Sequence, residues 1–169
     1  MNQAEKAELL EQIEKWNDAG EFSQCIQAIE AVLETERDYL LTLKLSRAYS
    51  NLAVLGDHRI HGKDGKVGMA PLRHAIALLE SIRSQGEKDP YWNARMGYST
   101  LMAYSSAATA YEYAQQWLAL APEDSDAQKL VQDCEGYLEE ERTLALDLKE
   151  REEIIQRETP DAGKVVICK

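Results

Sequence analysis

The chain has 169 residues, of which 44% are hydrophobic and 29% are charged, and its net charge is −11. This charge disfavours binding to nucleic acid or to an anionic membrane surface, because both present phosphates that need lysine and arginine partners. No segment reaches the ~20 apolar residues of a membrane span, and the start lacks a secretory signal pattern, so we expect a cytoplasmic protein.

The first predicted helical hairpin covers about residues 4–36. Apolar residues over 7–16 recur at spacings of three and four, which is typical of an amphipathic helix. Gly20 then supplies a turn, and a second apolar stripe over 22–35 ends near Leu33. Two such short helices are expected to pack against each other, because neither can bury its apolar face alone.

The second predicted hairpin covers about residues 38–86. Its first helix spans about 38–55, and Pro71 stands near the start of its second helix, about 70–85. The intervening loop at 56–68 has four glycines and little apolar content, which makes it longer than a hairpin needs.

This glycine-rich loop does not match a known ligand motif. Lys63 is followed by Asp64 and no strand precedes the loop, so it is not a phosphate-binding loop. His58 and His61 lack a convincing third ligand, so no metal site is expected. We expect a solvated connector, although contact of its basic residues with an acidic partner stays open.

The third predicted hairpin covers about residues 89–121. Asp89 is placed to cap its first helix and Pro90 favours the first turn of a helix. That helix runs to about residue 104, and the second covers about 106–120.

A final helix is predicted over about 125–157. Ser125 and Gln128 resemble a capping box at its start. Its beginning is amphipathic enough to cover the third hairpin, whereas the later part is dominated by charge. Residues 123–158 contain thirteen acidic and five basic residues. A C-terminal tail at 159–169 follows, whose run at 164–168 is apolar and strand-prone and is either free or folded back onto the groove.

The spacing of large, small and helix-ending residues adds a family resemblance. Trp92 or Tyr91 is placed to fill the gap between two helices, Gly97 to permit close approach, and Pro122 to end the unit. On these landmarks, residues 6–122 resemble three tetratricopeptide repeats, similar to small bacterial repeat proteins of poorly defined role. Departures are Leu9 where Trp is typical and Ser105-Ser106 where a glycine turn is expected.

The resemblance implies an all-α fold, a right-handed α-α superhelix of about three hairpins plus the long C-terminal capping helix. It implies that the first helices of the hairpins line a concave groove that binds a peptide or helix of a partner protein. Candidate contact residues are Arg47, Asn51, Tyr91, Arg95, Tyr98 and Met102.

Each candidate has a purely structural alternative. Arg47 and Arg95 could bind a ligand carboxylate or pair with neighbouring acids, and the aromatic residues could pack the hairpins instead of a ligand. Glu14, on the first hairpin, would repel a carboxylate, which disfavours the subclass that binds chaperone tails.

We expect no catalytic residue and no cofactor. Cys25 takes a small-residue position and is expected to be buried and inert. Besides an adaptor, two functions stay open. One is an immunity or regulatory antagonist that uses the acidic C-terminal helix against a basic target. The other is a self-assembling module or homodimer, joined through a seam of Leu144, Leu148 and Ile155.

Overall fold

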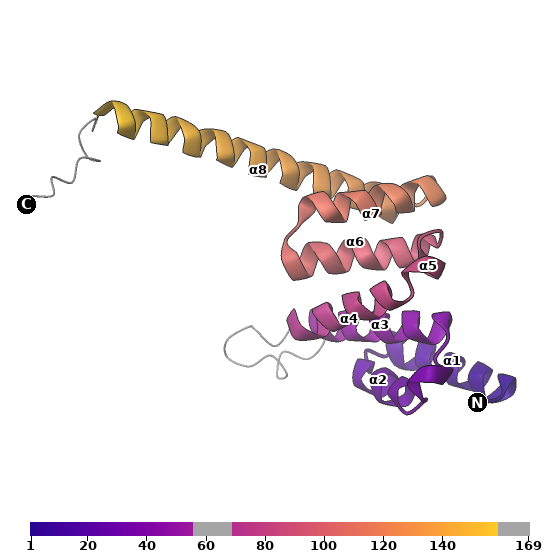
Figure 1. Cartoon of the computed structure of the whole chain (residues 1–169). Helices are drawn as coiled ribbons and strands as arrows, with labels where there is room; N and C mark the ends of the chain where they lie inside the picture. Colours follow the sequence, from indigo (N-terminus) through magenta and orange to yellow (C-terminus); the bar gives the residue numbers. More distant parts are fainter. Residues whose placement is uncertain (56–68, 159–169) are drawn as a thin grey trace, which may run out of the picture.

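The protein is all-α in the computed structural model, which describes residues 1–55 and 69–158 (Figure 1). The predicted fold class is thus confirmed, and no strand occurs within those two ranges. The elements are α1 (Gln3–Asp18), α2 (Phe22–Glu30), the 3-10 turn η1 (Glu34–Glu36), α3 (Tyr39–Leu55), α4 (Met69–Ser81), α5 (Arg83–Gly86), α6 (Pro90–Tyr104), α7 (Ala107–Leu120) and α8 (Ser125–Glu158). The predicted loop at 56–68 and tail at 159–169 lie outside the described residues.

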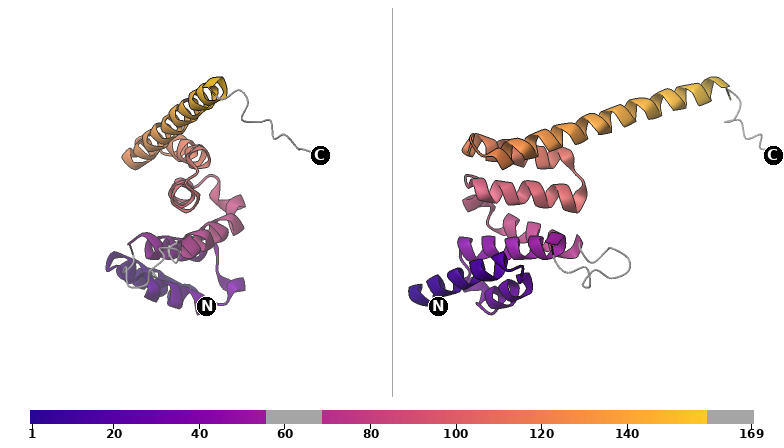
Figure 2. Two further views of the ribbon diagram at one scale, coloured as in Figure 1. Left: turned by 90° about the vertical axis from the view of Figure 1, so that its left-hand side faces the viewer. Right: turned by 180° about the vertical axis from the view of Figure 1, so that it is seen from behind.

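The helices form a stack of hairpins. α1 pairs with α2, α3 with α4, and α6 with α7, while α8 packs on α7 (Figure 1). α1, α3 and α6 also contact one another in succession, so the first helices of the hairpins form one row. The beginning of α8 belongs to the stack, whereas its later half extends well beyond it, as both views of Figure 2 show.

Three connected clusters of buried side chains hold the stack together. The first joins α1, α2 and α3 and includes Ile13, Ile29 and Leu41. The second joins α3, α4 and α6, and the third joins α6, α7 and α8. Trp92 lies in the second cluster, is 1% exposed, and donates its indole N–H to the carbonyl oxygen of Leu79 at 3.0 Å. Trp92 thus fills a gap between packed helices, as predicted, and it contacts α4 of the preceding hairpin as well as Tyr113 of its own hairpin.

Local chain geometry explains the strongest sequence signals. Asp89 caps α6 by accepting a hydrogen bond from the backbone N–H of Tyr91 at 2.8 Å. Gly20 has a φ of 78° in the first turn, as expected. Ser105 has a φ of 49°, so a serine takes the left-handed position that the repeat pattern normally gives to glycine.

The close packing predicted at Gly97 is confirmed. A Cβ added there would lie 2.9 Å from a methyl carbon of Leu130 on α8 and 3.6 Å from the carbonyl oxygen of Ala110 on α7. Gly97 therefore lets α6 approach both later helices.

Two predicted helix boundaries and one predicted helix cap were wrong. α2 ends at Glu30, because Arg37 donates hydrogen bonds to the carbonyl oxygens of Glu30 and Val32 and turns the chain there. Leu33, assigned to the apolar stripe, is consequently 67% exposed.

The helix predicted over 70–85 is interrupted at Ile82. The short helix α5 follows the break, and its Gly86 packs against the ring of Trp92. The cap of α8 is Asp124 rather than Ser125. The Asp124 carboxylate accepts hydrogen bonds from the backbone of Asp126 and Ala127, a position that also suits the helix dipole.

Candidate protein-binding surface

Polar side chains from α1, α3 and α6 lie side by side along the row of first helices. We call this surface the polar face; its residues are Glu14, Asn17, Lys44, Arg47, Asn51, Tyr91 and Arg95. Within each helix they recur three or four residues apart, so they lie on one side of it. The stacking of α1, α3 and α6 then brings the three stripes into contact.

Glu14 is the acidic centre of this face. Its carboxylate pairs with Lys44 at 2.6 Å and with Arg47 at 2.9 Å. Partial burial raises the pKa of Glu14, but the hydrogen bonds from Lys44 and Arg47 outweigh it and hold that pKa below its usual value. The alternative reading of Arg47, pairing with a neighbouring acid, is confirmed. Glu14 is also matched by two cations, which removes most of the repulsion expected toward a carboxylate.

A second chain of polar contacts crosses the same helices. The side-chain amide of Asn51 donates to the Asn17 oxygen at 2.8 Å, and Arg95 donates to the Asn51 oxygen at 3.4 Å. The guanidinium of Arg95 also lies over the ring of Tyr91, 5.0 Å from its centre. Within 1–55 and 69–158, Arg95 has no ion pair, in contrast to Arg47.

A hollow of about 140 Å³ opens beside this chain of contacts. It brings together four of the six predicted contact residues: Asn51, Arg95, Tyr98 and Met102. Arg47 and Tyr91 lie on the polar face outside the hollow. Met102 is 45% exposed, so the hollow is open to solvent at that side.

The sequence reasoning missed Lys44 on the polar face and Val54, Leu55, Leu72 and Ser99 in the hollow. Val54 and Leu55 line the hollow and are 42% and 68% exposed. Lys44 lies on the polar face through its pair with Glu14. Its spacing of three from Arg47 and seven from Asn51 was a usable signal, because such residues share one side of a helix. The exposure of Val54 and Leu55 had no comparable signal.

The aromatic residues divide between packing and surface. Tyr98 packs edge-on against Trp117 of α7, with ring centres 6.0 Å apart. Burial, assisted by the nearby Asp126 carboxylate, raises the pKa of Tyr98, so it stays protonated at neutral pH. Trp92 and Tyr98 therefore pack between helices, as the structural alternative predicted. Tyr104 is 55% exposed and lies mainly at the surface. The hydroxyl oxygen of Tyr91 is buried without a hydrogen-bond partner in the described structure.

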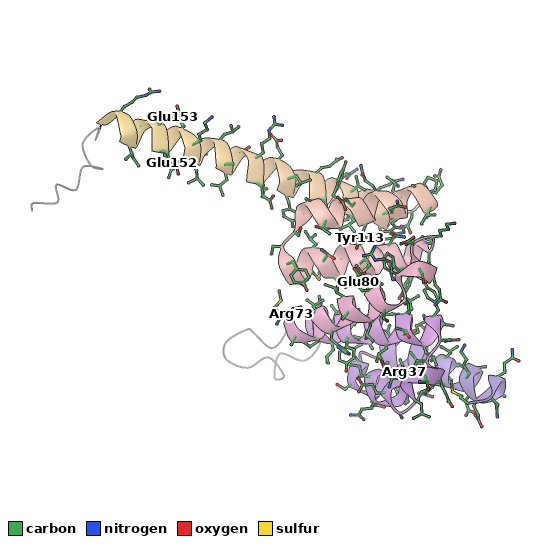
Figure 3. All side chains as sticks on the ribbon, viewed as in Figure 1. Arg37, Arg73, Glu80, Tyr113, Glu152 and Glu153 are labelled. Atoms are coloured by element: carbon green, nitrogen blue, oxygen red, sulfur yellow. The ribbon has the colours of Figure 1, made fainter. Side chains whose placement is uncertain are left out.

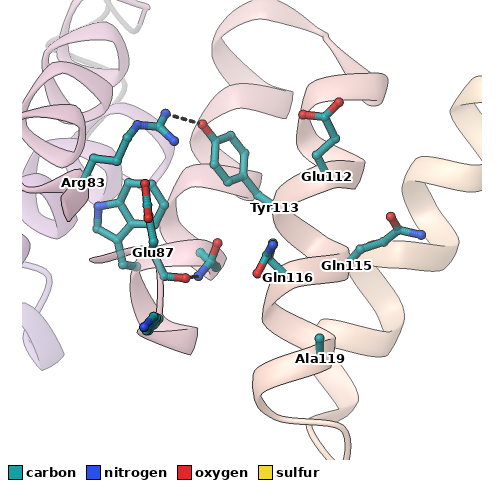
Figure 4. Close-up of a pocket in the computed structure, with 10 residues that line it drawn as sticks. Arg83, Glu87, Glu112, Tyr113, Gln115, Gln116 and Ala119 are labelled. Carbon is teal, nitrogen blue, oxygen red and sulfur yellow. Dashed lines mark hydrogen bonds between the residues drawn. The ribbon is translucent and has the colours of Figure 1, made fainter. Parts of the chain in front are cut away.

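Another hollow, of about 730 Å³, lies between α5, α6 and α7 (Figure 4). Arg83 spans it, donating to the hydroxyl of Tyr113 at 2.8 Å and pairing with Glu80; Figure 3 labels both partners. These hydrogen bonds raise the pKa of Arg83 and keep it charged. Arg83 also lies over Trp92, 5.4 Å from the ring centre. Its contacts join α4, α6 and α7, and no nucleophile–base pair lines this hollow.

Other reactive groups are buried or scattered. Cys25 and Cys134 are both fully buried, and burial raises the pKa of each thiol, so neither is a ready nucleophile. No group of three or more metal-ligating side chains occurs among the described residues. His58 and His61 lie outside them. No helix of the described ranges is both long enough and apolar enough to cross a membrane.

In comparisons with known proteins, no family model, no curated protein and no solved structure matches the chain.

Proposed function

We propose that this protein is a non-enzymatic, tetratricopeptide-like adaptor that holds a peptide or helix of a partner protein on the polar face and in the adjoining hollow. The observation that carries the proposal is the state of Arg95. It is held in place by the Tyr91 ring and by Asn51 at the edge of an open hollow, yet it has no acidic partner in the described structure. An arginine held in this way is ready to bind a carboxylate or a backbone carbonyl of a ligand.

The charges of the polar face define the chemistry of the partner. The face carries three cations, Lys44, Arg47 and Arg95, and one carboxylate, that of Glu14, which pairs with the first two. The face is therefore locally positive on a protein whose net charge is −11. A local positive site favours a segment with an acidic side chain or a free carboxyl end.

Part of the lining of the hollow is apolar. Val54, Leu55 and Met102 line it together with Asn51 and Arg95, and all three apolar side chains are exposed. Peptide-binding sites often combine an apolar pocket for one side chain with amide or guanidinium groups for the main chain. We infer that the bound segment places an apolar residue beside an acidic one, with Asn51 hydrogen-bonded to its backbone.

The test is a selection of random peptides on the purified full-length protein, followed by affinity measurement of the enriched peptides. We expect peptides that carry an acidic residue next to an apolar one. Removal of both polar groups in the variant N51A/R95A is expected to weaken their binding at least about tenfold.

The matched control is R73A, which removes an exposed arginine from α4, off the polar face (Figure 3). We expect it to bind the selected peptides with unchanged affinity. Helical content and melting temperature, measured by circular dichroism, must agree between the variants. Selected peptides that bind N51A/R95A as tightly as the unmodified protein would refute this site.

A further inference from the structure

The later half of α8, residues 139–158, leaves the stack of hairpins and is called the arm below (Figures 1 and 2). Its side chains from 139 to 155 are all exposed. Leu144 and Leu148 are 60% and 52% exposed, and Tyr137, just before the arm, is 49% exposed. Large apolar side chains at regular spacing on an exposed helix indicate a surface that another helix covers.

The exposed apolar residues continue the face by which α8 packs on its own stack. Leu130 and Cys134 are 1% and 0% exposed against the third cluster. From them, spacings of three and four lead along the helix through positions 130, 134, 137, 141, 144, 148, 151 and 155. This is a heptad pattern, and we call the last six positions the seam. The side of α8 that packs on its own stack therefore continues along the arm, where it is exposed.

We propose that the seam pairs, antiparallel, with the seam of a second copy of this protein. The residue numbers of the seam are symmetric about position 146. An antiparallel pair centred there places Leu144 against Leu148 of the second copy and Tyr137 against Ile155 of the second copy. The same symmetry places Glu141 against Arg151 of the second copy, twice in the dimer.

The two charged seam positions select this arrangement over others. A parallel pair would set Glu141 against Glu141 and Arg151 against Arg151, and like charges at a helix seam are destabilising. A purely basic target would match Glu141 but would meet a like charge at Arg151. Opposite charges at mirrored positions are what a helix needs to recognise its own antiparallel copy.

The space beside the arm accommodates the second helix. A hollow of about 570 Å³ lies between the α6–α7 turn and α8, lined by Leu101, Met102, Tyr137 and Leu144 with Glu140 and Glu141. In the antiparallel pair, Ile155 of the second copy arrives opposite Tyr137, at this hollow. The seam from 137 to 155 is about 27 Å long, which gives five helical turns of contact. The two stacks then lie at opposite ends of the helix pair.

This pairing has a different readout from the proposed peptide site. Met102 lines both hollows, but the residues altered in the test below, Glu141 and Arg151, lie outside the peptide site. The test is sedimentation equilibrium of the full-length protein from about 2 to 200 µM. We expect a monomer–dimer equilibrium within that range. The single reversals Glu141→Arg and Arg151→Glu each create a like-charge pair at the seam and are expected to weaken dimerisation at least about tenfold. The double variant E141R/R151E restores opposite charges and is expected to return to within about threefold of the unmodified protein.

Two matched controls change the net charge by the same amounts away from the seam. Glu139→Arg and Arg142→Glu alter residues of an exposed pair 4.0 Å apart on the outer side of the arm, and we expect them to leave dimerisation within about threefold. Circular dichroism at low concentration must show that all variants keep their helical content. A protein that stays monomeric to 200 µM would overturn the proposal. So would equal effects of reversal at 139 and 141, or a double variant as weak as the single ones.

Discussion

The two halves of α8 differ in what surrounds them, although they belong to one unbroken helix. Residues 125–138 place Ala127, Leu130 and Cys134 in the core, at 0–1% exposure. The arm keeps similar leucines at similar spacing, yet they are more than half exposed. An apolar stripe on a helix therefore predicts a surface that another element covers. Whether an element of the same molecule covers it depends on the helices that lie beside it.

The same comparison separates two sources of helix stability. The stack is held by buried clusters that join successive hairpins. The arm contains exposed ion pairs, such as Arg157 with Glu153 at 3.6 Å, and its residues are not among those of the three buried clusters. Pairs of this kind contribute only a few tenths of a kcal/mol each. A mutation in the stack should therefore lower the free energy of unfolding, and a mutation in the arm should leave it nearly unchanged.

A substitution at Trp92 in the stack and one at Leu144 in the arm test this difference in stability. Trp92→Ala removes a side chain that is 1% exposed and leaves the carbonyl of Leu79 without its indole donor. We expect the free energy of unfolding to fall by about 3–5 kcal/mol. Leu144→Ala, in the arm, should change it by less than about 0.5 kcal/mol in the monomer. Urea unfolding followed by circular dichroism at low protein concentration measures both, and similar losses would contradict the contrast.

Substitution of glycine by alanine should change the free energy of unfolding in opposite directions at two positions. A Cβ at Gly86 would lie 2.4 Å from ring carbons of Trp92, whereas a Cβ at Gly136 on α8 meets nothing within 4 Å. Trp92 is buried and hydrogen-bonded, so its ring cannot move aside cheaply. We expect Gly86→Ala to lower the free energy of unfolding by about 1–3 kcal/mol. Gly136→Ala should raise it by about 0.5–1 kcal/mol, because alanine is the better helix former. Urea unfolding midpoints measure both, and a stabilised Gly86→Ala would refute the packing.

Most of the fold could be predicted from the sequence, because its signals are local. Apolar spacing, the cap at Asp89 and the close approach at Gly97 each act within a turn or between adjacent helices. The errors arose where a distant or unusual contact decided the outcome. Arg37 ends α2 from seven residues away, and Ser105 adopts the left-handed conformation at a turn where the repeat pattern expects glycine.

The candidate surface could be predicted only in part. The repeat resemblance placed Asn51, Arg95, Tyr98 and Met102 in one groove, and the structure brings these four to one hollow. It could not decide between a free and a paired arginine, because that depends on which side chains the neighbouring helix presents. Arg47 meets Glu14 across the α1–α3 contact, whereas Arg95 meets an aromatic ring and an amide.

The ion pairs of Glu14 with Lys44 and Arg47 should make a small, pH-dependent contribution to stability. The pKa of Glu14 is below its usual value in the folded protein, so the folded state favours the carboxylate. Its stabilising effect is full above the unfolded pKa, near 4.5, and fades as the pH falls through the lower folded pKa. Because the side chain is 42% exposed, solvent screening limits this effect to less than about 1 kcal/mol.

Glu14→Gln should therefore lower the melting temperature at pH 7 by at most about 2–4 °C, and the difference should shrink toward zero near pH 3. Glu139→Gln, which changes a glutamate of the arm, should match the unmodified protein at both pH values, since its partner Arg142 is 4.0 Å away and both side chains are more than 70% exposed. Thermal unfolding by circular dichroism between pH 3 and 7 measures both variants. A difference for Glu14→Gln that grows as the pH falls would mean that Lys44 and Arg47 do not stabilise the folded stack through this carboxylate, and the contrast between stack and arm would then be one of apolar packing alone.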